Sequence, residues 1–212
     1  MRYSSDNVET QASTDPRARR HAEMKARILQ EAWRIAARDG VAGISLSGLA
    51  KAVGLRQPSL YTYFDSKAGL FDEMFADGYR RAISAVVDQQ YPDDPRDALK
   101  LFLRRCVAFS STHPAEHTLL FQRPIPGFEP STDSFALAER FYEPFRALMA
   151  RIGIMKQADL DVLISLTQGL TDQQVANDPG GHRWADLVDD AVDMVLDRVH
   201  NGGGFGKRGR RR

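Results

Sequence analysis

The sequence has one cysteine, Cys106, and no long apolar run. A single cysteine excludes an intramolecular disulfide and is typical of a reducing compartment. No apolar stretch approaches the roughly 20 residues that span a bilayer, and residues 1–20 lack the apolar segment of a secretory signal. We therefore expect a cytoplasmic protein that has no contact with membranes.

The sequence also lacks the alternation of apolar and polar residues that marks half-buried strands. Apolar residues recur instead at helical spacing, as at Ile28, Ala32, Ile35 and Ala36, and segments rich in proline and glycine separate such stretches. This pattern predicts an all-α fold of about nine helices.

The near-neutral charge of +1 conceals an uneven distribution. Residues 1–70 carry 11 Lys and Arg against 7 Asp and Glu, whereas residues 71–200 carry 13 against 21. Residues 201–212 add 5 basic residues and no acidic one. Basic ends around an acidic middle indicate a polyanionic partner at one end of the molecule, the alternative being chance scatter.

Residues 46–64, LSGLAKAVGLRQPSLYTYF, have the layout of two short helices joined by a tight turn. Ala50 is the small residue required where the helices cross, and Gly54 permits the turn. An upstream helix over residues 25–39 gives this pair a surface to pack on. The apolar residues expected to face the shared core are Leu49, Val53, Leu55 and Leu60.

Capping residues mark where these helices begin and end. Gly40 ends the upstream helix, and the Ser45 side chain caps the next one. Pro58 is suited to the first position of the third helix, with Gln57 as its cap. The three helices form a unit whose last helix can enter the major groove of DNA.

Leu60 and Phe64 are four residues apart and are expected to be buried, which leaves their polar neighbours for DNA. Gln57 can bind adenine through two hydrogen bonds, and Ser59 can bind several base edges. Tyr61 and Tyr63 offer hydroxyls for phosphate, although half-buried packing is the alternative for each. The predicted DNA-binding residues are Ser45, Ser47, Arg56, Gln57, Pro58, Ser59, Tyr61, Thr62, Tyr63 and Lys67.

Residues 28–75 resemble the DNA-binding domain of the TetR family of transcriptional regulators. The hallmark of that family, L-Y-x-[HY]-F followed by x-x-K, reads here Leu60-Tyr61-Thr62-Tyr63-Phe64-Asp65-Ser66-Lys67. The resemblance implies a homodimer that binds a palindromic double-stranded DNA operator and a small-molecule effector of unknown identity, most often as a repressor that the effector releases. Many members have Ser or Thr where Arg56 stands; Arg56 cannot cap a helix with an oxygen and is expected to approach phosphate.

In this family the last two long helices usually form a four-helix bundle across the dimer. The corresponding helices here are expected over residues 157–177 and 184–200. The residues implied as dimer interface or core are Leu163, Leu166, Leu170, Leu187, Val188, Ala191, Val192 and Val195.

Aromatic residues of the C-terminal half belong either to the core or to an effector pocket. A pocket of some hundreds of cubic ångströms favours an effector-responsive regulator, whereas a solid core favours a dimeric DNA-binding protein without an effector. A third possibility, an α-helical enzyme or carrier, is disfavoured because no nucleophile and base are apparent. The aromatics are Phe102, Phe109, Phe121, Phe128, Phe135, Phe141, Tyr142, Phe145 and Trp184.

The segment HPAEH, residues 113–117, matches a zinc-protease pattern in which two histidines share a helix face. However, Pro114 marks a helix start with His113 as its cap, and no third ligand follows. We therefore predict a helix start at the surface, with no metal, no cofactor and no enzymatic activity.

These observations divide the chain into four segments. Residues 1–20 form a disordered arm, and residues 21–68 form the helix-turn-helix domain. Residues 69–200 form a helical domain for effector binding and dimerisation. Residues 201–212 form a flexible basic tail whose contact with DNA the sequence leaves open.

Overall fold

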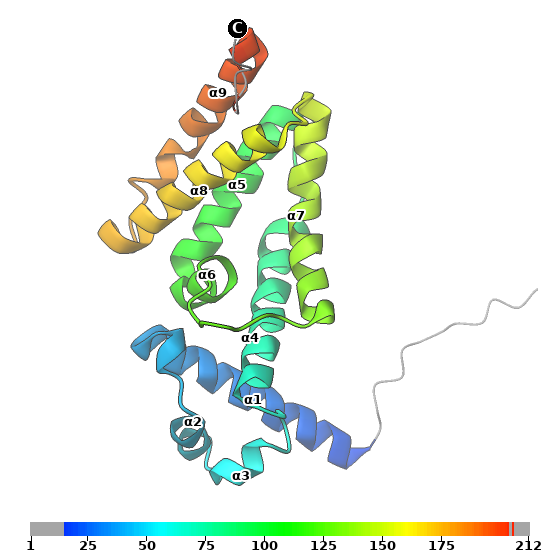
Figure 1. Cartoon of the computed structure of the whole chain (residues 1–212), viewed down its shortest axis with the longest axis vertical. Coiled ribbons are helices and arrows are strands. Elements are labelled where there is room, and N and C mark those ends of the chain that lie inside the picture. The colour runs from blue at the N-terminus through cyan, green and yellow to red at the C-terminus, as the bar shows by residue number, and fades with distance from the viewer. Residues whose placement is uncertain (1–14, 204, 206–212) are drawn as a thin grey trace, which may run out of the picture.

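The computed structural model describes residues 15–203 and residue 205. Within these residues the chain forms nine α-helices and no strand, which confirms the predicted all-α fold (Figure 1). The helices are α1 (Pro16–Asp39), α2 (Leu46–Ala52), α3 (Gln57–Leu60), α4 (Lys67–Ala82), α5 (Pro95–Thr112), α6 (Pro114–Phe121), α7 (Thr132–Ile152), α8 (Gln157–Asn177) and α9 (Val188–Arg198). Residues Ile83–Val87 prolong α4 as a wider π-helical turn.

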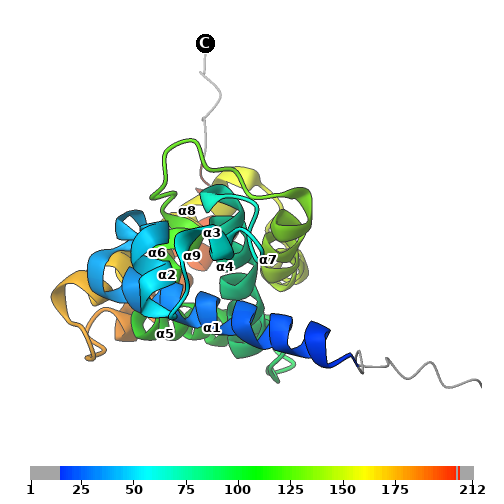
Figure 2. The same ribbon diagram turned by 90° about the horizontal axis from the view of Figure 1, so that it is seen from below.

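Helices α1 to α3, here called the helix-turn-helix unit, form one end of the molecule, as Figure 2 shows from below. Helix α4 leads from them into the layer of α5 to α9 (Figures 1 and 2). Along α1, Ile28, Ala32 and Ala36 are all buried, as their spacing predicts. Leu70 and Met74 of α4 are fully buried against the same core, which continues without a break into the C-terminal helices. The helix-turn-helix unit therefore packs against α4 through this shared core.

Residues 1–14 of the predicted arm lie outside the described part of the chain, whereas its last residues are helical. Helix α1 begins at Pro16, because the Asp15 carboxylate caps it by accepting from the Arg17 amide at 2.8 Å. The arm prediction is therefore wrong for residues 16–20.

The predicted tail also differs from expectation where it is described. After α9 the chain kinks at Asn201 and Gly202, whose backbone angles are not helical, and the Phe205 amide donates to the buried Asp159 carboxylate of α8 at 2.6 Å. The remaining residues of the tail lie outside the described ones. The expected boundary between residues 68 and 69 falls inside α4.

None of the described helices is long and apolar enough to cross a membrane.

Candidate nucleic-acid interface

The turn between α2 and α3 is held by backbone conformation and by one cap. The Ser45 hydroxyl accepts from the Gly48 amide at 3.1 Å, so the predicted cap of α2 is confirmed. Gly54 has φ +75°, a conformation that costs other residues energy. The Leu55 amide then donates to the Ala50 carbonyl at 2.8 Å and closes the turn. Ala50 is buried at the crossing, as expected.

Helix α3 is a single turn followed by further turns up to Tyr63. Its N-terminal cap is Arg56, whose side chain makes no capping hydrogen bond, and Gln57 is already helical. The prediction of Gln57 as the cap is wrong: Pro58, with its fixed φ, is compatible with the second helical position as well as the first. The backbone alone therefore starts this helix, and the Gln57 side chain remains free for other contacts.

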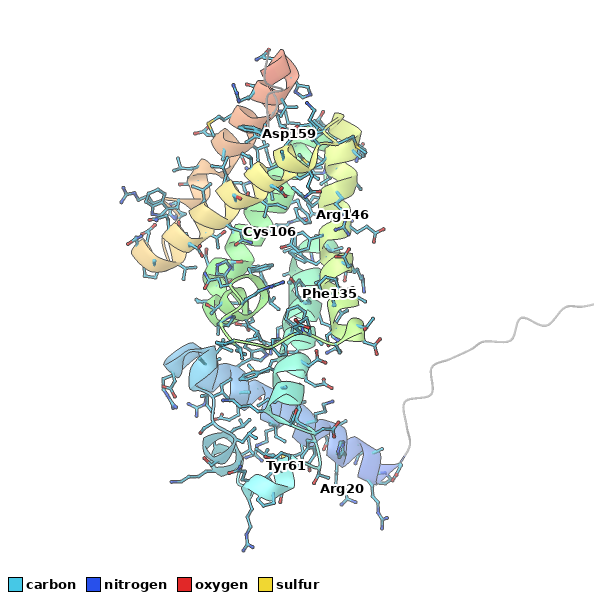
Figure 3. All side chains as sticks on the ribbon, viewed as in Figure 1. Arg20, Tyr61, Cys106, Phe135, Arg146 and Asp159 are labelled. Carbon is cyan, nitrogen blue, oxygen red and sulfur yellow. The ribbon has the colours of Figure 1, made fainter. Side chains whose placement is uncertain are left out.

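Two buried side chains anchor α3 and the turns after it, here called the recognition turn, from behind. Leu60 and Phe64 are buried, as their spacing predicts, and the Phe64 amide donates to the Leu60 carbonyl at 3.0 Å. Because these two side chains point inward, Gln57, Pro58 and Tyr61 project to solvent. Tyr61 is 49% exposed, and Figure 3 shows it at the free end of the molecule.

The predicted DNA-binding residues fall into two groups by exposure. Ser59 and Tyr63 are half-buried, and Tyr63 stacks on His21 of α1 with ring centres 4.6 Å apart. Tyr63 therefore has a packing role whatever else it contacts. The remaining predicted residues are all exposed: Ser45, Ser47, Arg56, Gln57, Pro58, Tyr61, Thr62 and Lys67.

Lys67 lies at the start of α4, beside the recognition turn. The neighbouring Ser66 caps this helix by accepting from the Gly69 amide at 2.9 Å. The Lys67 ammonium lies 5.4 Å from the centre of the Phe71 ring, which steadies the aliphatic stem while the charge stays in solvent. Its position suits a phosphate contact.

Polar contacts fix α1 against α4 and link both to α6. The Trp33 indole donates to the Asp77 carboxylate at 2.7 Å, and Lys25 pairs with Glu73. Arg81 then pairs with Asp77 and with the buried Glu116, each at 2.9 Å. These contacts therefore connect α6, through α4, to α1 of the helix-turn-helix unit.

The C-terminal helices enclose two adjoining spaces. A cleft of about 800 Å³ lies beneath the loop of residues 123–130. Phe121, Tyr142 and Ile164 line both this cleft and a deeper cavity of about 40 Å³. All of the aromatic residues expected in the core or in a pocket, except Trp184, line at least one of the two spaces.

The deeper cavity is walled by uncharged groups. Burial raises the pKa of the Cys106 thiol and raises the pKa of Tyr142 to about 12, so both stay neutral at physiological pH. The hydroxyls of Thr167 and Thr171 are engaged with backbone carbonyls of α8 at 2.9 and 2.8 Å. Such walls are suited to an apolar, uncharged ligand group.

The HPAEH segment is more buried than expected. His113 is the N-cap of α6, as predicted, but Glu116 and His117 are buried, so the predicted surface location is wrong for them. Neighbouring helices supply their partners: Glu116 pairs with Arg81 of α4, and His117 donates through Nε2 to the Asp172 carboxylate of α8 at 2.9 Å. Across the described residues, no three His, Cys, Asp or Glu side chains are grouped to hold a metal.

The predicted dimer residues divide between the core and a free face. Leu163, Val188, Val192 and Val195 are buried in the chain's own core, so they are not on an outward surface as an interface would require. The other four predicted residues lie on an open apolar surface of α8 and α9, here called the α8–α9 face. The apolar residues of this face are Leu166, Gly169, Leu170, Leu187, Ala191 and Met194, and Ser165, Gln173 and Asp190 also line it.

Met194 also belongs to this face, where its side chain is 58% exposed. It was not among the residues predicted from the sequence. The spacing of α9 could have predicted its exposure, because Met194 lies two residues after Val192 and one before Val195. The buried valines define the inner face of α9, and Met194 lies off that face.

Residues 28–74 match the family model described as bacterial regulatory proteins, tetR family. The HTH-type transcriptional regulators Mb1846 of Mycobacterium bovis and Rv1816 of Mycobacterium tuberculosis are each 26% identical to the chain over 117 residues. That alignment covers 54% of this chain and 50% of each relative. The chain thus spans about half the length of the curated relatives it matches.

Solved structures share the fold over most of the chain. The regulatory protein SCO4313 is 21% identical with a TM-score of 0.67, and the alignment covers 86% of this chain and 100% of that one. The TetR family transcriptional regulator PfmR from Thermus thermophilus is 21% identical with a TM-score of 0.61, covering 86% and 97%. At this identity the likeness concerns the fold, including the helical C-terminal part.

Proposed function

We propose that this chain is a regulator of the tetR family of bacterial regulatory proteins, which binds a palindromic DNA operator in the cytoplasm and represses transcription until a small molecule releases it. The observation that carries the proposal is the recognition turn. Gln57, Pro58 and Tyr61 are exposed together, while Leu60 beneath them is buried. A rigid exposed turn with amide and phenol groups suits the major groove.

Two protomers would provide two such turns. One helix-turn-helix unit has a small contact surface, roughly 600–1,000 Å² for a single module, so specific binding favours a twofold dimer. The α8–α9 face is the proposed contact, because exposed Leu187 and Met194 and half-buried Leu170 form an apolar surface open to solvent. A dimer through this face leaves both recognition turns free at the opposite end (Figure 1).

The cleft and the deeper cavity are the proposed effector site. A combined space of this size accommodates a small organic molecule, which supports effector response over a DNA-binding protein with a solid core. The uncharged walls of the deeper cavity favour an apolar part of the ligand, whereas the cleft is also lined by the charged side chains of Arg123, Glu129 and Glu139 and so can hold a polar part.

The route from effector to DNA is proposed to pass through α6. Phe121 of α6 lines both spaces, and Glu116 of the same helix pairs with Arg81 on α4. A ligand that binds one position of α6 better than another would shift the population of α4 orientations, and with it the spacing of the two recognition turns.

Two experiments test these points separately. The first selects duplexes from a random-sequence library with the purified protein and measures affinity by fluorescence anisotropy; enrichment of a palindrome is expected, and no enrichment would refute operator binding. The second screens small molecules that combine an apolar part with a polar or charged part by thermal shift. A ligand at 100 times its Kd adds about 2.7 kcal/mol to stability, and it should weaken operator binding if it is an effector.

A further inference from the structure

The first three turns of α1 precede the segment that matches the family model. Residues 16–27 carry five basic residues and one acidic residue, Glu23. At about 1.5 Å per residue, they extend α1 by about 18 Å ahead of residue 28. The first part of α1 is therefore a basic helical extension that precedes the matched segment.

This extension is held beside the recognition turn. The His21 ring stacks on Tyr63, and its Nε2 donates to the Thr62 carbonyl at 3.2 Å. Both contacts join α1 to the turn that follows α3. Figure 3 shows Arg20 and Tyr61 at the same end of the molecule. A DNA strand lying along the recognition turn would pass this part of α1.

The arginines of the extension differ in the helix face on which they lie and in whether they form an ion pair. Arg17 lies four residues before His21 and so on the same helix face, and Arg20 is adjacent to that face. Arg19 lies on the opposite side and pairs with Glu23 at 3.5 Å. All three arginines are exposed. Within the described residues neither Arg17 nor Arg20 forms an ion pair, and the Arg20 side chain donates only one hydrogen bond, from Nε to the Pro16 carbonyl at 3.1 Å.

We propose that Arg17 and Arg20 form a phosphate clamp, a second DNA contact that anchors the backbone next to the recognition turn. The inference rests on the proposed operator binding. Guanidinium groups bind phosphate through paired hydrogen bonds and carry no base preference in that role. The clamp would therefore set how the recognition turn is positioned and add to affinity on any sequence.

The test uses the full chain with Arg17→Ala and Arg20→Ala combined. The probes are the duplex that the unmodified protein enriches from a random library and an unselected duplex of equal length. We expect weaker binding to both probes, with the slope of log affinity against log salt reduced by about 0.9 for each phosphate that is no longer neutralised. Arg19→Ala is the control, since it removes one positive charge from the other side of the same helix, and it should leave the slope unchanged; each single variant, Arg17→Ala and Arg20→Ala, is compared with it at equal charge.

A second variant separates charge from packing. Arg17→Lys combined with Arg20→Lys should keep most of the salt slope, because lysine also binds phosphate as a point charge. Far-UV circular dichroism and melting temperature check that each variant is folded.

The outcomes distinguish the inference from the proposed function. If the alanine variant has the same salt slope as Arg19→Ala, or if the lysine variant loses as much slope as the alanine variant, the clamp is refuted while DNA binding stands. If the unmodified chain shows no salt-dependent affinity for either duplex, operator binding itself fails.

Discussion

Tyr61 and Tyr63 are two residues apart in the sequence and have different surroundings in the structure. Tyr61 is exposed at the end of α3, whereas Tyr63 stacks on His21 and packs on the core. Half-buried packing, the alternative to a DNA contact, is therefore found for Tyr63 and not for Tyr61. Tyr61 remains the candidate for a DNA contact through its hydroxyl and ring edge, and Tyr63 fixes the turn to α1.

Gln57 is the residue with the strongest expectation of base reading. Its amide is exposed in the first turn of α3 and takes no part in capping. We predict that Gln57→Ala costs about 1–3 kcal/mol on the selected operator and relaxes preference at one base pair in each half-site. Anisotropy titrations against single-base operator variants measure both effects.

The control for this prediction is Gln30→Ala, at an exposed position of α1 away from the recognition turn. It should leave affinity and base preference unchanged. Equal loss of affinity on selected and unselected DNA after Gln57→Ala would show that Gln57 contacts only the backbone.

Lys67 is expected to act through charge alone. Lys67→Ala should weaken binding to all sequences alike and lower the salt slope by about one unit for each protomer, because one phosphate per protomer is then left without its ammonium partner. Lys156→Ala, at an exposed position before α8, removes the same charge far from the recognition turn and should change neither. An unchanged slope after Lys67→Ala would remove Lys67 from the interface.

At the scale of elements, the turn between α2 and α3 depends on the φ of Gly54. An added Cβ there meets no atom within 4 Å, so a substitution is opposed by backbone strain and not by a clash. We predict that Gly54→Ala lowers the free energy of unfolding by about 1 kcal/mol, as expected for a left-handed alanine. Urea titration monitored by circular dichroism gives the value.

Asparagine tolerates the left-handed region better than alanine does, so Gly54→Asn should be less destabilising. If both substitutions are neutral, the turn must relax to another conformation, and the rigidity claimed for the recognition turn would be wrong.

The elements that local rules govern were predictable from the sequence. Apolar spacing located the helices, Ser45 and Gly54 located the turn, and Leu60 with Phe64 defined the inward side of α3. Each of these depends on neighbours within about four residues along the chain.

What the sequence missed depends on contacts between distant segments. Residues 16–20 are helical although they lack an apolar stripe, because Asp15 caps them and His21 is tied to Thr62, 41 residues away. His117 is buried because α8 supplies Asp172, 55 residues away. The division of the α8 and α9 leucines and valines between core and outer face likewise requires knowing which side packs on α5.

At the scale of the whole molecule, the α8–α9 face lies far along the chain from the recognition turn, and the two ends are connected by α4 and the buried core. The helix-turn-helix unit gives its outward side to the proposed DNA contact, so the twofold contact has to come from elsewhere. Half-sites on a palindrome are about one helical turn, roughly 34–36 Å, apart. The proposed dimer through α8 and α9 would have to hold its two recognition turns at such a spacing.

We predict that the unmodified chain is a homodimer at micromolar concentration without DNA, and that Met194→Glu yields a folded monomer that no longer binds the operator. Met194 is exposed, so a charge there does not disturb the core, but it would be buried without a partner in the dimer. Met155→Glu is the matched control: Met155 is 74% exposed in the connection between α7 and α8, off the α8–α9 face, and its substitution should leave the dimer intact. Sedimentation velocity measures the mass, and circular dichroism reports folding. If the unmodified chain sediments as a monomer yet binds a palindrome tightly, the proposed dimer is wrong and only the helix-turn-helix assignment stands; if Met155→Glu dissociates the dimer and Met194→Glu does not, the contact lies on a different face.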